Sequence, residues 1–168
     1  MAPALNPLGK NAQTKNAQAL TVPSAAAVRL AGLADAHAVA SLYREVWGDE
    51  AGGLDEAQDW LEHGGALVLE SGEGTMVAAL RWREDAGSWR LDRLAALPDY
   101  RGQGFGRWLM TKVEALAIKG NVPALFLALD PEHGELLGYY RRLGYRQADA
   151  CGPRVLLTKP LGGAWQYK

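Results

Sequence analysis

From Ala26 onward, the hydrophobic residues change repeatedly between a two-residue period and a helical period. This alternation predicts strands and helices in one mixed α+β domain that ends near Leu161. We expect a short strand within 27–35, helices over 36–47 and 54–63, strands over 66–70, 75–84 and 88–97, a helix over 105–120, a strand over 123–130, a helix over 134–145 and a strand over 153–161. Asp35 stands where it could cap the first helix.

Three of the predicted strands follow one another with only turns between them. The turn "SGEG" and the turn over 85–87 favour hairpins, so residues 66–97 predict an antiparallel meander that ends at Leu97 and Pro98. The later segment "PALFLALD" is almost wholly apolar, which is typical of a strand at the centre of a sheet.

Composition limits the classes of function. The chain has 168 residues, 48% hydrophobic and 22% charged, as expected for one soluble domain. Its formal net charge of −1 argues against a nucleic-acid partner, because such domains usually carry a basic excess. The single cysteine, Cys151, excludes an internal disulfide and a cysteine-based zinc site, and we expect it to be a small buried or half-buried residue. The histidines His37 and His63 read as exposed helix residues, and no metal-ligand spacing is present, so we expect no metal.

The two ends of the chain have a different character. Residues 1–25 contain Pro, Asn, Gln and Ala without periodicity and predict a flexible arm, and residues 162–168 predict a tail. No apolar segment approaches the ~20 residues of a membrane span, and no apolar leader follows the first Met, so we expect a cytoplasmic protein without a membrane partner.

The stretch "LPDYRGQGFGRWLM", residues 97–110, places three glycines at the start of a predicted helix. They fit neither the dinucleotide-binding pattern, because the third glycine position is occupied by Arg107, nor a P-loop, because no Lys-Ser/Thr pair follows. Unpaired N–H groups at a helix N-terminus bind anions, and Arg101 and Arg107 add positive charge. The alternative is that the glycines only form a tight turn.

These residues resemble a known family. Residues 101–106, "RGQGFG", fit the Q/R-x-x-G-x-G/A signature of the GNAT superfamily of acyl-CoA-dependent N-acetyltransferases. The lead-in "RLAALPDYR" is similar to the family's fourth strand, and "GYYRRLGY" is similar to its Tyr-x-x-x-Gly-Phe/Tyr segment, with Tyr140, Gly144 and Tyr145 on the pattern. The terminal "VLLTKPL" resembles the closing strand, so the resemblance covers residues 26–161.

The resemblance implies a mostly antiparallel central sheet, flanked by helices, whose fourth and fifth strands splay apart at a bulge. It implies acetyl-CoA as co-substrate, with the pantetheine arm along the backbone of 95–97 and the pyrophosphate on the N–H groups of 103–107. The implied cofactor-binding residues are Ala95, Ala96, Leu97, Arg101, Gly102, Gln103, Gly104, Phe105, Gly106 and Arg107.

The resemblance also implies that Tyr140 is the general acid that protonates the departing thiolate, with Tyr139 packing on the sheet. The general base is open. Asp92 lies in the right strand, but it could equally be a charge paired across strands, and a bulge would leave undecided whether Asp92 or Arg93 faces the cleft. Glu70 is a weaker candidate.

Two further features bear on the ligands. His133 stands where the family often has an asparagine that touches the cofactor, so it either binds cofactor or acceptor or faces solvent. Seven acidic residues and no basic one lie between Glu45 and Glu62, in the region that overhangs the acceptor cleft in the family. They favour a cationic amine acceptor, on a small molecule or a peptide, or else form a solvated face. Trp47 in this region either walls the cleft or covers the core.

We therefore expect an N-acetyltransferase that acts by direct attack of an amine on the thioester, as a monomer or homodimer. The alternative is a non-catalytic acyl-CoA-binding sensor or interaction module of the same fold.

Overall fold

The computed structural model describes residues 26–148 and 152–162. The predicted N-terminal arm, Cys151 and all but the first residue of the predicted tail lie outside this range. The strands are β1 (Ala27–Leu30), β2 (Gly65–Glu70), β3 (Met76–Asp85), β4 (Ser88–Ala96), β5 (Ala124–Leu129), β6 (Arg146–Gln147) and β7 (Val155–Pro160). The α-helices are α1 (Ala36–Trp47), α2 (Leu54–His63), α3 (Phe105–Lys119) and α4 (Leu136–Arg142). Short 3-10 turns are η1 (Leu33–Asp35), η2 (Gly48–Ala51), η3 (Pro98–Tyr100) and η4 (Pro131–His133).

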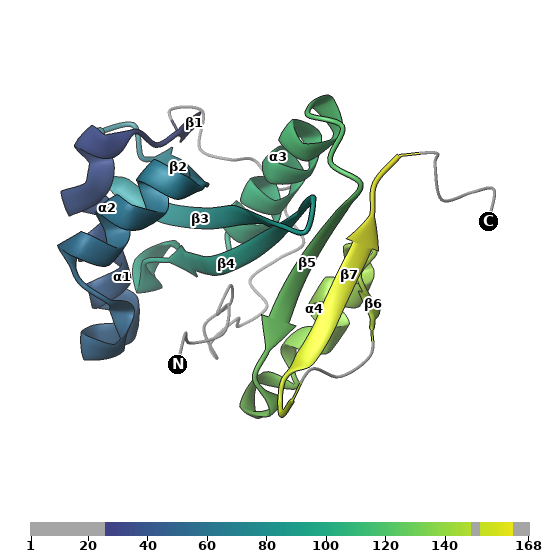
Figure 1. The fold of residues 1–168 in the computed structure, drawn as a ribbon. Coiled ribbons are helices and arrows are strands. Elements are labelled where there is room, and N and C mark those ends of the chain that lie inside the picture. The colour runs from purple at the N-terminus through teal and green to yellow at the C-terminus, as the bar shows by residue number, and fades with distance from the viewer. Residues whose placement is uncertain (1–25, 149–151, 163–168) are drawn as a thin grey trace.

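One mixed sheet of seven strands, in the order β1-β2-β3-β4-β5-β7-β6, organises the domain (Figure 1). The strands β1 to β4 pair antiparallel in sequence, which confirms the predicted meander and adds β1 to its edge. The pair β4 and β5 is parallel, and β7 lies antiparallel between β5 and β6. The expected mostly antiparallel α+β sheet flanked by helices is therefore confirmed.

Two local expectations are corrected. The predicted helix over 134–145 ends at Arg142, because Gly144 takes a left-handed φ of +94° that breaks the helix, and the two-residue strand β6 then follows. Asp35 does precede α1, but its carboxylate makes no cap bond to that helix. Instead it accepts from the Gly32 N–H and from the guanidinium of Arg29.

The helices cover the sheet in two layers. On one face, α3 and α4 bury Leu109, Val113 and Tyr140 against apolar strand residues such as Leu94. On the other face, α1 packs on a smaller cluster that includes Ala79 and Ala95 of the neighbouring strands β3 and β4. Because both faces of β4 are covered, its residues beyond Leu91 are buried except for Asp92, which is half-buried.

A β-bulge interrupts β4 where the sheet opens. Ala79 of β3 faces Ala95, but Arg81 faces Asp92, so two β4 residues, Arg93 and Leu94, stand opposite the single residue Leu80. Within this bulge, the backbone of Arg93 has a left-handed φ of +50°. Nearby, β4 pairs with β5 only at Trp89 and Arg90. The two strands then diverge toward their carboxyl ends (Figure 1), as the splay expected from the resemblance requires.

Candidate functional site

The open side of β4 leads directly into the glycine segment. Within the described residues, no strand pairs with β4 on its β5 side after Arg90, so its backbone is free there. The Leu97 N–H donates to the Val77 carbonyl at 2.9 Å and holds the end of the strand against β3. The Nε of Arg101 donates to the Ala96 carbonyl at 3.2 Å. This bond folds the segment after η3 back onto β4.

The glycines that follow take conformations which other residues adopt at a cost. Gly102 has a φ of +75° and Gly104 a φ of +83°. Gly104 is the N-cap of α3 and offers no side chain, and the first helical bond runs from the Trp108 N–H to the Gly104 carbonyl at 3.0 Å. The preceding N–H groups of 105–107 therefore have no partner within the helix and are available to an anion.

Tyr140 lies on α4 and is fully buried. Its ring contacts Tyr139 and Tyr145 edge-on, with centroids 5.1 and 5.7 Å away. Its hydroxyl has no hydrogen-bond partner in the described part of the chain. Burial raises the pKa of the Tyr140 hydroxyl well above 10, so it remains a proton donor. Tyr139 is also buried in part, and Arg107 and Arg142 lie near enough to oppose the rise of its pKa to about 12, which is caused mainly by burial.

Because of the bulge, the side chains of Asp92 and Arg93 both lie on the α1–α2 side of the sheet. The Asp92 carboxylate accepts from Nε and Nη2 of Arg81, at 3.2 and 2.9 Å. The Arg81 guanidinium lies over the ring of Trp60 on α2, 3.9 Å from its centroid. The Arg93 guanidinium lies over Trp47 of α1 at 5.3 Å. Asp92 is thus a charge paired across strands, as one of the two interpretations predicts.

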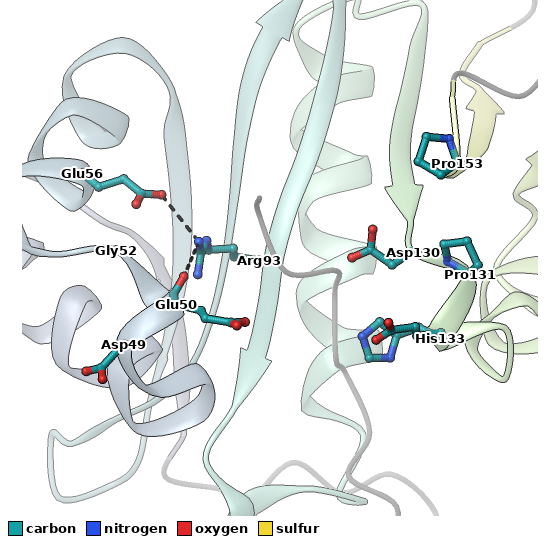
Figure 2. Close-up of a pocket in the computed structure, with 10 residues that line it drawn as sticks. Asp49, Glu50, Gly52, Glu56, Arg93, Asp130, Pro131, His133 and Pro153 are labelled. Carbon is teal, nitrogen blue, oxygen red and sulfur yellow. Dashed lines mark hydrogen bonds and ion pairs between the residues drawn. The ribbon is translucent and has the colours of Figure 1, made fainter.

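A cavity of about 890 Å³ opens beside β4 at the bulge. Figure 2 shows its two walls: Arg93 and acidic residues of the η2–α2 segment on one side, and residues that follow β5 on the other. The lining residues are Asp49, Glu50, Gly52, Glu56, Arg93, Asp130, Pro131, Glu132, His133 and Pro153. The cavity therefore lies next to the predicted pantetheine-binding strand, on its α1–α2 side.

The structure brings together only some of the predicted residues. His133 lines the cavity, and its Nδ1 lies 3.7 Å from a Glu135 carboxylate oxygen. Asp92 and Tyr140 do not line it, and neither do the glycines of the loop. Glu70 pairs with Arg29 at the β1–β2 edge, at 2.6 Å.

Of the seven predicted acidic residues, three reach the cavity: Asp49, Glu50 and Glu56. Sequence reasoning left open whether Arg93 faces the cleft, and it did not assign Asp130 or Glu132 to the site. A signal existed for the last two, because both stand beside His133 in "DPEHGE", directly after the central strand. None existed for Arg93, because a bulge decides the direction of its side chain.

A sheet that opens between two parallel strands, with a glycine-rich loop and a helix N-terminus at the opening, defines the fold of the GNAT acyltransferases. The chain belongs to the acetyltransferase (GNAT) family, whose model matches residues 36–145.

Known proteins agree with this assignment. A curated acetyltransferase of Yersinia pestis is 29% identical over 95 residues, covering 55% of this chain and 67% of the relative. The solved PaiA N-acetyltransferase of Thermoplasma acidophilum, in complex with coenzyme A, superposes with a TM-score of 0.71 at 15% identity and covers 80% of this chain and 98% of its own. The ribosomal-protein-S18-alanine N-acetyltransferase of Escherichia coli superposes with a TM-score of 0.73 at 18% identity, and the match covers 85% of this chain and 98% of that one. At these identities the solved structures establish the fold alone.

The described residues contain no group of three His, Cys, Asp or Glu side chains that could bind a metal ion. No helix among them has the length and apolar character to cross a membrane.

Proposed function

We propose that the protein transfers an acetyl group from acetyl-CoA to a primary amine by direct attack, with Tyr140 as the general acid. The observation that carries this proposal is the open edge of β4, which leads into the glycine loop while α4 brings a buried, protonated phenol to the same sheet. We place this reaction in the cytoplasm, in a monomer or homodimer.

The donor site is built from backbone. Residues 95–97 lie on the open side of β4, where backbone groups that do not pair with β3 can bond the amides of a pantetheine arm, as an added strand would. The N–H groups of Gln103 to Arg107 face the position of the pyrophosphate, and the positive φ of Gly102 and Gly104 shapes the loop around it. Arg101 and Arg107 add charge. These residues fit coenzyme A without a metal ion.

Tyr140 acts on the leaving group. The amine nitrogen forms a bond to the thioester carbon, the carbon–sulfur bond breaks, and the sulfur takes the proton of the Tyr140 hydroxyl. The hydroxyl is then restored by a proton from solvent. Because burial holds the pKa of Tyr140 well above 10, the group is fully protonated whenever a turnover begins.

The proton of the acceptor ammonium needs a different route. Arg81 holds the Asp92 carboxylate through two hydrogen bonds, so we assign Asp92 to orienting Arg81 beneath α1 and α2. A direct base role for Asp92 is the weaker alternative. His133 lines the cavity and is 32% exposed, and its imidazole can take a proton from the acceptor and pass it to water.

The acceptor binds in the cavity beside β4. Its five carboxylate-bearing residues, from both walls, favour a protonated amine over an anion. Holding this amine next to the thioester converts the reaction into an effectively intramolecular one, which lowers the barrier by several kcal/mol.

A screen tests this function. The purified protein is given acetyl-CoA and a panel of amines that includes polyamines, aminoglycosides, amino acids and peptides with free N-termini, and thiol release is measured. We expect at least one amine to stimulate release with formation of its acetyl amide. Binding of CoA without turnover on any amine would contradict the enzyme and favour the acyl-CoA sensor.

A further inference from the structure

Arg93 is a buried cation in the wall of an acidic cavity. Its side chain is 3% exposed. One nitrogen, Nη2, donates to the Glu50 carbonyl at 3.1 Å and lies 3.8 Å from Glu56 Oε1. The other two, Nε and Nη1, are buried and have no hydrogen-bond partner among residues 26–148 and 152–162. A guanidinium remains charged and donates from all three nitrogens, so most of its hydrogen-bonding capacity is unused.

This arrangement of Arg93 lowers the stability of the fold when no ligand is bound. A buried donor without an acceptor is destabilising, the more so when it is charged. The backbone of Arg93 also takes a φ of +50°, in the region that L-residues rarely adopt. The bulge thereby turns Arg93 to the cavity side of β4, the side already taken by Asp92. The bulge accounts for this φ, so it is the two buried, unpaired guanidinium nitrogens that point to a ligand for Arg93.

The remaining charges of the cavity define that ligand. Asp130 is neutralised by Arg154, whose Nε lies 2.9 Å from its carboxylate. Three other lining carboxylates form no ion pair within the described chain: Asp49, Glu50 and Glu132. Their field attracts an ammonium and repels a simple anion, whereas the unpaired N–H groups of Arg93 bind an anion most strongly. A molecule that carries both an ammonium and a carboxylate satisfies the two requirements together.

We propose, on the basis of the acetyl transfer proposed above, that the acceptor is an amino acid or a similar amino carboxylate whose carboxylate binds Nε and Nη1 of Arg93. Its amine, held near the bulge, is the group that is acetylated. Both nitrogens are screened from solvent, so the ligand's carboxylate reaches them only when η2 moves aside; Gly48 and Gly52, with φ of +63° and +76°, stand at the two ends of η2. A polyamine would leave the buried donors of Arg93 unpaired.

The wild-type protein provides the first test, which needs no variant. Free amino acids are compared with their own amides and with the matching decarboxylated amines, by initial rates of thiol release. We expect at least one amino acid to exceed both analogues by about 10- to 100-fold in kcat/KM, mostly through KM, as expected for a lost charge-assisted hydrogen-bonded pair. Equal rates for the acid and its amide would overturn the carboxylate proposal while leaving acetyl transfer intact.

Variants then locate the anchor. Arg93→Gln should remove the preference for the acid, measured as the ratio of kcat/KM for the acid to that for its amide, and Arg93→Lys should restore part of this ratio, since it keeps the charge but not the planar fork. Arg83→Gln is the matched control, because Arg83 lies over a tryptophan ring, that of Trp60, as Arg93 lies over Trp47, but Arg83 does not line the cavity. Coenzyme A affinity and thermal unfolding are measured for each variant to confirm that the fold is retained.

Two outcomes would count against the assignment in different ways. A preference for acids that survives Arg93→Gln would remove Arg93 as the anchor. No turnover of any amine, with or without a carboxylate, would instead overturn the acetyl transfer on which the proposal rests.

Discussion

The hydroxyls of Tyr139, Tyr140 and Tyr145 are buried close together, and none has a hydrogen-bond partner among the described residues. Burial raises the pKa of each, so all three remain protonated in neutral and mildly alkaline solution. Acidity therefore does not single out one of them. What distinguishes Tyr140 is its position on the sequence pattern and its complete burial against the sheet.

Tyr140→Phe should reduce kcat about 100-fold or more, because a positioned general acid typically contributes that much. Stability should stay the same or rise, since the lost hydroxyl makes no hydrogen bond in the described structure. Tyr139→Phe and Tyr145→Phe are matched controls that remove equally buried hydroxyls. Steady-state rates, coenzyme A affinity and thermal unfolding are measured for the three variants. A loss of turnover shared equally by all three would contradict the assignment.

Residue roles could be predicted where they depend on local sequence, and not where they depend on register. The left-handed glycines at 102 and 104 follow from the local pattern, because a helix start after a tight turn needs them. The direction of Arg93 does not, because one extra residue in β4 reverses the alternation that a strand otherwise imposes.

At the scale of elements, Arg101 has two roles in the segment between β4 and α3: it holds the loop, and it can bind a phosphate. The Nε of Arg101 donates to the Ala96 carbonyl, while its remaining nitrogens are available to a phosphate. Arg101→Ala should weaken coenzyme A binding about tenfold or more, and it should shift the melting temperature by only a few degrees. Isothermal titration and thermal unfolding measure the two effects.

Lys112→Ala is the matched control for this segment, because it removes one positive charge from the exposed face of α3 away from its N-terminus. It should change coenzyme A affinity by less than about twofold. A large loss of stability in Arg101→Ala with unchanged coenzyme A affinity would mean that Arg101 only holds the loop against β4.

Ion pairs of Arg29 hold the edge strand β1 in place. Arg29 pairs with Asp35 at 2.8 Å and with Glu70 at 2.6 Å. The hydrogen bond from Arg29 lowers the pKa of Asp35 to about 2 from its usual 3.8. A depressed carboxyl pKa stabilises the fold above the unfolded value, and this contribution is lost as pH falls from about 4 through 2.

Asp35→Asn should therefore lower the free energy of unfolding by about 1 kcal/mol at pH 7, since the side chain of Arg29 is exposed enough for solvent to screen the pair. Near pH 2 the variant and the wild type should converge. Urea unfolding at both pH values measures the difference, with Asp85→Asn, at the exposed last residue of β3, as control. A difference that persists at pH 2 would mean that packing, not charge, is lost.

At the scale of the whole molecule, the order of elements could be predicted because each segment shows its own period and the meander has short turns. The cavity could not, because its walls come from η2 and η4, which lie some 80 residues apart in the chain (Figure 2). Only the opening of β4 from β5 places them face to face. The short β6 also escaped prediction, since two exposed residues carry no period.

The folded domain as a whole should lose stability in alkali. Burial raises the pKa of four tyrosines, Tyr43, Tyr139, Tyr140 and Tyr145, above the usual 10. Above about pH 10 the unfolded chain releases these protons while the folded chain keeps them, so folding stability, fully present below that pH, falls as pH rises. The slope should approach about 1.4 kcal/mol per pH unit for each tyrosine that titrates only on unfolding. Tyr139 should cease to contribute above about pH 12.

Urea unfolding from pH 8 to 11, together with tyrosinate absorbance of the folded protein, measures this dependence. Tyr145→Phe should reduce the slope above pH 10 by about a quarter, because it removes one of the four linked protons. If the folded protein instead forms tyrosinate at these positions near pH 10, the hydroxyls are reached by water without unfolding. The phenol proposed as the general acid would then titrate within the working range of the enzyme, and kcat should fall above pH 10 in step with the absorbance.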